Sequence, residues 1–140
     1  MNNPLNAYKE TQIKTANQGK LIIMLYDGVI KNINSALEGL KAKHHKFDEI
    51  NKYIIKAQDI VTELIVSLDF DKGGEISKNL FSLYIYTNRL LLNANMKKDD
   101  NLLKEAKKIL SELRGAWIEI VKKGNIDSGS SSPGGINIAG

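Results

Sequence analysis

Residues 47–68 read FDEINKYIIKAQDIVTELIVSL, and this stretch has the most regular apolar pattern in the 140-residue sequence. Its apolar residues recur at alternating intervals of three and four positions, the a/d pattern of helices that pack side by side. This seam comprises Phe47, Ile50, Ile54, Ala57, Val61, Leu64 and Leu68. The stretch therefore predicts one helix of a bundle, and the segments on either side of it should supply the partners.

Three further segments show helical periodicity, at residues 17–40, 76–94 and 103–124. Asn17 is a suitable N-cap for the first of them, because its side chain can accept a hydrogen bond from a free backbone N–H. The predicted inward residues are Ile22, Leu25, Val29, Ile33, Ala36 and Leu40 in the first helix, Ile76, Leu80, Leu83, Thr87, Leu90 and Ala94 in the third, and Leu103, Ala106, Leu110, Leu113, Trp117 and Ile120 in the fourth.

The two prolines, Pro4 and Pro133, lie near the ends of the chain, so the strongest helix breaker is absent from its middle. Short connections between long helices favour antiparallel neighbours. We therefore expect an all-α fold, an antiparallel up-down four-helix bundle over residues 17–124. A mobile N-terminal arm (residues 1–16) and a disordered Ser/Gly-rich tail (residues 125–140) should flank it.

The segments Asp69–Gly74 and Asn95–Asp100 are predicted to be the loops on either side of the third helix. The first of them resembles the opening of a calcium loop. However, Gly73 stands where such a loop needs an Asp or Asn, and Leu80 stands where it needs a Glu. A helix-connecting turn is the preferred interpretation.

Composition argues against several classes of function. The chain has no cysteine, and its two histidines, His44 and His45, are adjacent in a basic stretch with no carboxylate at ligand spacing. No Gly-rich phosphate cradle or acid/base constellation is visible, so we predict no metal, no cofactor and no enzymatic activity. The net charge is +4, but the lysines are interleaved with acidic residues, which does not favour nucleic acid binding. No apolar run is long enough for membrane insertion and no signal peptide is visible, so a cytosolic protein is expected.

The sequence has more apolar residues than these seams require. In the first helix Leu21, Ile23, Met24 and Tyr26 are surplus, because the run from Leu21 to Tyr26 covers every side of the helix. The surplus elsewhere comprises Ile55, Ile60, Ile65 and Val66 in the second helix, and Phe81, Tyr84, Ile85, Leu91 and Leu92 in the third. We assign about half of these residues to a wider core and the rest to a surface groove for a partner.

Three segments together resemble the FliS family of flagellar secretion chaperones. They are residues 15–28 (TANQGKLIIMLYDG), residues 68–80 (LDFDKGGEISKNL) followed by LYIY at 83–86, and residues 110–117 (LSELRGAW). The resemblance covers roughly residues 4–122. The chain departs from the family at Gln18, where proline is usual, and at Lys20, where an acidic residue is common.

The resemblance implies a four-helix bundle that binds the disordered C-terminal segment of flagellin, prevents its premature polymerisation and aids its delivery to the flagellar type III export gate. It implies that the loaded chaperone interacts with the export gate component FlhA. It further implies that the N-terminal arm, through Leu5, Tyr8 and Ile13, covers the groove when the client is absent.

The residues expected to contact the client are apolar or carry amide groups, apart from Gly28, which would admit a client helix at close range. They are Leu21, Ile23, Met24, Leu25, Gly28, Ile54, Ala57, Gln58, Val61, Tyr84, Asn88, Leu91 and Asn95. An alternative from a different class is a homo-oligomeric helical structural or adaptor protein, in which the surplus apolar surface is a subunit interface. A membrane-surface or nucleic-acid adaptor is a third alternative. We expect a monomer or a weak homodimer.

Overall fold

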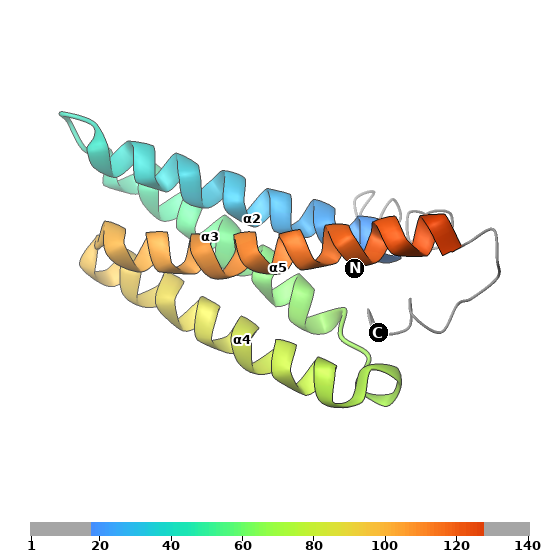
Figure 1. Cartoon of the computed structure of the whole chain (residues 1–140). Coiled ribbons are helices and arrows are strands. Elements are labelled where there is room, and N and C mark those ends of the chain that lie inside the picture. The colour runs from blue at the N-terminus through green and yellow to red at the C-terminus, as the bar shows by residue number, and fades with distance from the viewer. Residues whose placement is uncertain (1–17, 128–140) are drawn as a thin grey trace, which may run out of the picture.

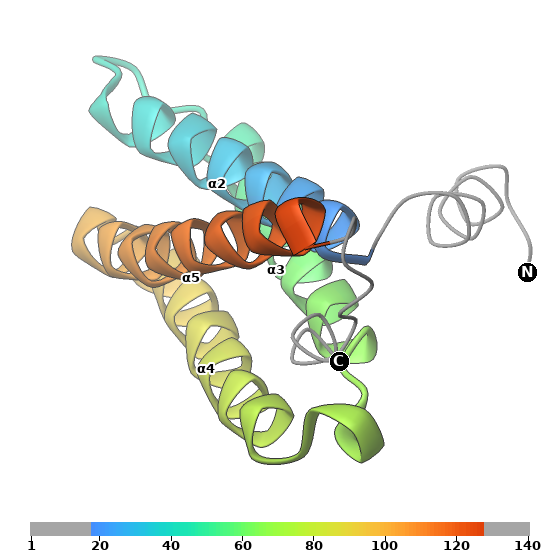
Figure 2. The same ribbon diagram turned by 45° about the vertical axis from the view of Figure 1, so that its right-hand side comes forward.

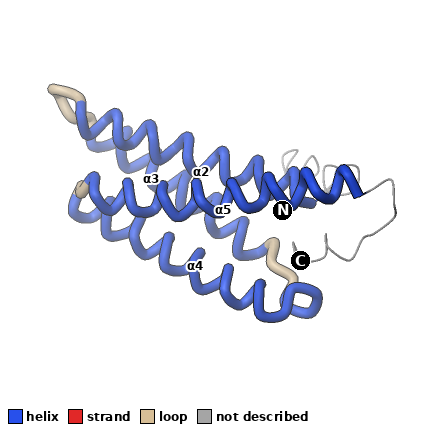
Figure 3. Tube along the Cα trace, viewed as in Figure 1, coloured by secondary structure: helices blue, strands red, loops and turns tan. Residues whose placement is uncertain are grey.

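The computed structural model describes residues 18–127, apart from the side chains of residues 124–127, and it consists of four helices. These are α2 (Gln18–Lys41), α3 (Phe47–Val66), α4 (Phe70–Lys97) and α5 (Asp100–Asp127). They pack antiparallel and are joined by short connections, as Figures 1 and 3 show. The all-α, up-down bundle predicted from the sequence is confirmed. The predicted N-cap Asn17, the arm (residues 1–16) and residues 128–140 of the tail lie outside the described residues.

The four helices form a ring. Helix α2 packs against α3 and α5, and α4 packs against the same two helices, so that α2 and α4 lie diagonally opposite each other (Figures 1 and 2). An ion pair between Asp27 on α2 and Arg114 on α5 closes the ring on the outside. The core runs along the middle of the ring. It is built from aliphatic side chains together with three aromatic residues, Tyr26, Tyr84 and Trp117.

The seam of α3 lies where the sequence predicted it, since Ile50, Ile54, Ala57, Val61 and Leu64 are all buried. The predicted first member of the seam is wrong. Phe47 is 49% exposed because it is the first residue of α3 and lies at the end of the bundle, where the other helices do not cover it. Its ring packs edge-on against His45 with centroids 5.4 Å apart. The last predicted member, Leu68, lies past the end of α3 and is partly buried against the core.

The buried face of α4 differs from the prediction at two positions in the first half of the helix. Ile76 and Leu83 were expected inside but are exposed, and Ser77 and Tyr84 take their places. The true seam comprises Ser77, Leu80, Tyr84, Thr87, Leu90, Leu91 and Ala94. The prediction failed at Ser77 because a hydroxyl residue was not expected inside, whereas Thr87 was correctly predicted to point inward. Both are satisfied, since Ser77 donates to the Asp69 carbonyl at 2.9 Å and Thr87 to the Leu83 carbonyl at 2.8 Å.

Helix α2 shows a similar shift. Tyr26, which lies off the predicted inward stripe, is fully buried, and Leu37 is buried as well. Leu25 and Leu40, which were predicted to point inward, are only partly buried against the core. A tyrosine is unfavourable inside a core unless its hydroxyl finds a partner, and the partner of Tyr26 lies on α4.

The loop predicted at Asp69–Gly74 is largely helical. Helix α4 already begins at Phe70, where Asp69 caps it by accepting a hydrogen bond from the Lys72 backbone N–H at 3.0 Å. The helix then breaks at Gly74, whose φ of 50° and ψ of −124° are non-helical. Nothing lies within 4 Å of a Cβ built on Gly74, so the backbone conformation, and not lack of space, requires glycine there.

The second predicted loop is shorter than expected. Helix α4 continues to Lys97, and the connection to α5 is Lys98–Asp99 rather than Asn95–Asp100. Lys98 adopts a left-handed conformation (φ 51°, ψ 43°) that ends α4. Helix α5 continues past its predicted end at Gly124 to Asp127, so the first residues assigned to the tail are helical.

Replacing Gly74 with alanine should destabilise the fold by roughly 1–2 kcal/mol, because an L-residue is strained at positive φ. Urea denaturation followed by circular dichroism measures this free energy. Gly115→Ala is the matched control, because Gly115 lies inside α5 with nothing within 4 Å of an added Cβ. That variant should gain up to about 1 kcal/mol from helix propensity. Equal effects at both positions would contradict the assignment of strain to Gly74.

Candidate functional site

The predicted site residues on α2 differ in exposure. Leu21 is buried, while Ile23 and Leu25 are partly buried and pack against the core. Met24 is 50% exposed and is therefore the large side chain that this segment offers to a partner. The apolar run thus serves mainly the bundle, with Met24 left at the surface.

Gly28 has a role inside the bundle. A Cβ built on this residue would lie 3.1 Å from Cδ1 of Ile60 on α3, which is tight. The small size of Gly28 therefore lets α2 and α3 approach each other. Its predicted role in admitting a helix from a partner stays a prediction.

On α3 and α4 the structure places several predicted site residues inside the core. These are Ile54, Ala57, Val61, Tyr84 and Leu91, all of which are fully buried or nearly so. In the described chain they support the surface from beneath, and a partner would reach them only if the helices moved apart.

The predicted amide residues lie nearer the surface, along the contact of α3 with α4. Gln58 and Asn95 are both partly buried. Asn95 is engaged within the chain, because Lys98 Nζ donates to its side-chain oxygen at 2.7 Å, to its carbonyl at 2.6 Å and to Asn51 Oδ1 at 2.5 Å. This lysine fastens the end of α4 to the beginning of α3.

The most exposed apolar face of α4 was not among the predicted site residues. We define the α4 strip as Phe81, Ile85, Leu92 and Met96, which are 36–72% exposed. Their spacing of four, seven and four places them on one side of the helix. At its beginning the strip is continued by Phe70, whose ring meets that of Phe81 edge-on at 5.9 Å.

The α4 strip adjoins an apolar edge of α3. Asn88 Nδ2 on α4 donates to Thr62 Oγ1 on α3 over 3.4 Å, which sets the register of the two antiparallel helices. Ile55 and Val66, which are exposed, lie on the same side of α3 as Thr62. We call the α4 strip together with Ile55, Thr62, Val66 and Asn88 the α3–α4 surface.

Asn88 leaves a polar group unsatisfied in this surface. Its Oδ1 is buried and has no hydrogen-bond partner within the described part of the chain. An orphaned acceptor of this kind costs about 1–3 kcal/mol. Such a cost at an otherwise apolar surface is typical of a functional position.

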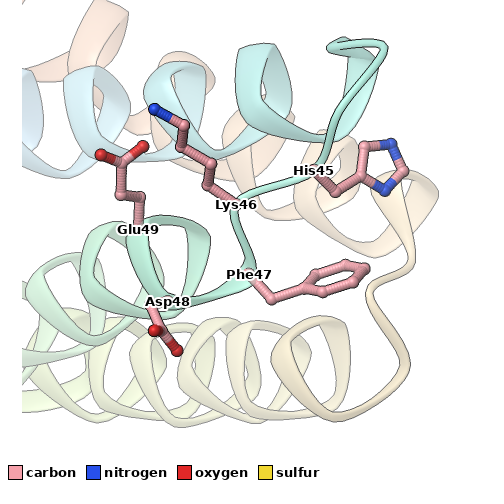
Figure 4. Close-up of a pocket in the computed structure, with 5 residues that line it drawn as sticks. All are labelled: His45, Lys46, Phe47, Asp48 and Glu49. Atoms are coloured by element: carbon pink, nitrogen blue, oxygen red, sulfur yellow. The ribbon is translucent and has the colours of Figure 1, made fainter.

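The titratable groups at the surface do not converge. Within residues 18–127 no group of His, Cys, Asp or Glu could hold a metal ion. A hollow at the beginning of α3 is lined by His45, Lys46, Phe47, Asp48 and Glu49, and Figure 4 shows the His45 and Phe47 rings on one side, with the Asp48 carboxylate pointing away from that of Glu49. Among the described helices, none is long and apolar enough to cross a membrane.

Two tyrosines meet in the core beneath the α3–α4 surface. The hydroxyls of Tyr26 and Tyr84 are 2.6 Å apart, and their rings are tilted with centroids at 6.4 Å. Burial raises the pKa of Tyr84 to about 12 and raises the pKa of Tyr26 further. Both phenols therefore stay neutral in the folded chain at pH values where an unfolded tyrosine ionises.

Folding stability should fall as the pH rises above about 10, the ordinary pKa of tyrosine. In this range the folded chain holds phenol protons that the unfolded chain has released, so alkali favours unfolding. The raised pKa of Tyr84 alone should lower the free energy of unfolding by about 1.4 kcal/mol by pH 11. Urea denaturation at pH 8, 10 and 11 measures the loss, and Tyr26→Phe/Tyr84→Phe should show a shallower decline. The same decline in that variant would contradict the assignment.

Residues 1–124 match the family model described as "Flagellar protein FliS". A "Flagellar secretion chaperone FliS" of Bacillus subtilis is 33% identical over 134 residues, which cover 96% of each chain. The protein of the same description from Salmonella typhimurium is 37% identical over 81% of this chain and 84% of its own length. That of Escherichia coli is 31% identical over 79% and 80%.

Proposed function

This chain belongs to the FliS family of flagellar secretion chaperones, and on this premise we propose that it binds the disordered C-terminal segment of flagellin on the α3–α4 surface. Like the family, it is not an enzyme. The observation that carries the proposal is the α4 strip, a row of exposed apolar side chains beside the unsatisfied Asn88. Bound there, flagellin would be kept from polymerising in the cytosol until the complex reaches the export gate component FlhA.

The dimensions of the strip suit an amphipathic helix. Residues 81–96 span about 22 Å of helix, or roughly four turns. A client helix with apolar residues at intervals of three and four would lie along it, as amphipathic helices do in other recognition surfaces. If the Asn88 side chain turns outward, its Oδ1, which is buried in the chain alone, can accept a hydrogen bond from the client, as the amide contact predicted from the sequence requires.

The energetics require a second contact area. Complete burial of a large apolar side chain contributes roughly 1.5–3 kcal/mol, but these side chains are already about half covered and would add about half of that. Six of them would then contribute roughly 5–9 kcal/mol, of which ordering a disordered client costs about 2–5 kcal/mol, and the lost translational and rotational freedom costs about as much again. We therefore include Met24, with its neighbours Ile23 and Leu25, as a second patch. Since α2 does not adjoin α4, a client that reaches both must wrap around α3.

Titration with a flagellin C-terminal peptide, followed by calorimetry, tests the proposal. Leu92→Asp should weaken binding by at least about tenfold, because a carboxylate would have to be buried against the client. Ser111→Asp, which adds the same charge at an exposed position of α5, should change affinity by less than about twofold. Absence of binding at micromolar peptide, or equal affinity of the two variants, would rule out the α3–α4 surface.

The N-terminal arm gives a separate prediction. We propose that residues 1–16, through Leu5, Tyr8 and Ile13, cover apolar surface when no client is present. An intramolecular competitor lowers the apparent affinity for a client. Removal of residues 1–16 should therefore strengthen peptide binding, measured in the same titration. Unchanged or weaker binding would count against a covering role.

One observation favours the alternative, a homo-oligomer. Phe81, Ile85, Asn88, Leu92 and Asn95 are spaced four, three, four and three, the a/d pattern of a coiled coil, with an asparagine in the centre. Light scattering coupled to size exclusion distinguishes the two. A dimer that persists at nanomolar concentration and dissociates on Leu92→Asp would assign the strip to self-association.

A further inference from the structure

The side of α4 that faces α5 is covered along only part of its length. Ile76, Leu83, Leu90 and Ala94 share this side, because they follow one another at intervals of seven, seven and four positions. Leu90 and Ala94 are buried there, whereas Ile76 is 40% exposed and Leu83 is 37% exposed. The side that α5 covers near the end of α4 is therefore open near its beginning.

Helix α5 does not stop short of this open part. The hydrogen bond from Tyr86 to Glu105 marks the register of the two antiparallel helices, so Ile76 is level with about residue 115 of α5. Helix α5 continues to Asp127. The exposure of Ile76 therefore means that the two helices move apart, as their ribbons do in Figures 1 and 2.

Apolar side chains of α5 face the same opening. Leu113, Ala116 and Ile120 are spaced three and four apart on the side of α5 that carries Glu105. Ala116 is exposed, and the other two are partly buried. We call Ile76, Leu83, Leu113, Ala116 and Ile120 the α4–α5 wedge. It lies on the opposite side of α4 from the α4 strip, and a separate apolar surface of this kind is typical of an interaction site.

The size of the α4–α5 wedge limits what can occupy it. A specific interface between two proteins takes about 20–30 residues from each partner. The wedge comprises five residues and is bounded at one end by the contact of Tyr86 with Glu105. It therefore suits a short segment with a few apolar side chains. That segment should be uncharged, because a charge buried against apolar groups is costly.

Residues 128–140 of this chain have that composition. They read SGSSSPGGINIAG, without a charged side chain, and their two large apolar residues are Ile136 and Ile138. In an extended chain, residues two positions apart point to the same side. Both isoleucines can then enter the wedge together. Pro133 and the two glycines that follow it disfavour a helix directly before them.

The length of chain beyond α5 is sufficient for this contact. Asp127, at the end of α5, lies about 17 Å along the helix axis from Ala116. The nine residues from there to Ile136 span up to about 30 Å when extended. The segment can therefore turn back at the end of α5 and lie against the wedge with length to spare.

We propose that residues 136–139 fold back onto the α4–α5 wedge of their own chain, with Ile136 and Ile138 covering the apolar side chains that α4 and α5 leave open. For these residues the proposal replaces the expectation of disorder. The covalent tether gives the segment an effective concentration in the millimolar range, so a small contact suffices. The proposal does not depend on flagellin, because it concerns the side of α4 opposite the α3–α4 surface.

Disulfide formation tests this placement in the full chain, which has no cysteine of its own. Ala139→Cys is combined with Ala116→Cys in the wedge or, as the matched control, with Gly115→Cys. Gly115 is exposed, lies one residue away and is turned by about 100° from the wedge, and nothing lies within 4 Å of an added Cβ there. Under mild oxidation the wedge pair should form an intramolecular disulfide at least about tenfold faster than the control pair.

Ile136→Ser/Ile138→Ser should reduce this ratio to less than about twofold, because the apolar contacts are lost while the tether keeps its length. A ratio near one in the parent chain would overturn the proposal. So would a preference for the wedge pair that survives the two serine substitutions. Disulfide-linked dimers in place of the intramolecular product would assign the wedge to the segment of a second copy and would also overturn it.

Maleimide labelling of Ala116→Cys distinguishes this segment from the N-terminal arm. The reaction should be at least about threefold faster with Ile136→Ser/Ile138→Ser and unchanged with Leu5→Ser/Ile13→Ser. The opposite result would assign the wedge to the arm and overturn the proposal. Labelling of Gly115→Cys should not respond to either pair of substitutions. An equal increase at that position would show that α5 has loosened as a whole, which contradicts a specific cover.

Discussion

Each helix of a four-membered antiparallel ring can turn only one face toward the shared core, and this constraint governs the whole molecule. Helix α5 fits it, because its described apolar residues are buried or partly buried, and α3 fits it apart from the exposed Phe47, Ile55 and Val66. Helix α4 does not fit it, because its apolar side chains exceed what one face can bury. The excess appears as the α4 strip. The surface that we propose for the client is therefore a direct result of core geometry in the described helices.

The predictability of the fold follows from residue chemistry. The seam of α3 consists of Ile, Ala, Val and Leu, so periodicity located it correctly, apart from Phe47 at the helix end. The seam of α4 was misplaced at Ser77, which is polar and bonds to a carbonyl, and at Tyr84, whose hydroxyl is buried beside that of a distant tyrosine. The predicted helix boundaries were wrong where backbone conformation decides them, as at Asp69, which caps α4 in a segment that was predicted to be a loop. These depend on φ and ψ, which composition does not reveal.

The same error in orientation affected the candidate site. Tyr84 and Leu91 were placed at the surface, whereas Ile85 and Leu92, one residue along, are the exposed members. The 4-3-4-3 spacing that runs from Phe81 through Asn88 was present in the sequence and would have identified them. It competed with an equally regular buried seam next to it. The two seams differ in polarity, because the buried one holds Thr87 and Ala94 where the other holds Asn88 and Asn95.

The connection between α4 and α5 bears on how the chain folds. Lys98 and Asp99 alone join these helices, and the lysine is bonded back to Asn51 and Asn95. Closing so short a loop costs little entropy, so pairing of α4 with α5 is a local event that can occur early. Pairing of α2 with α5 is the opposite case, since Asp27 and Arg114 are separated by 87 positions. A probe at the Asp27–Arg114 pair would therefore register the last stage of folding, when the ring closes.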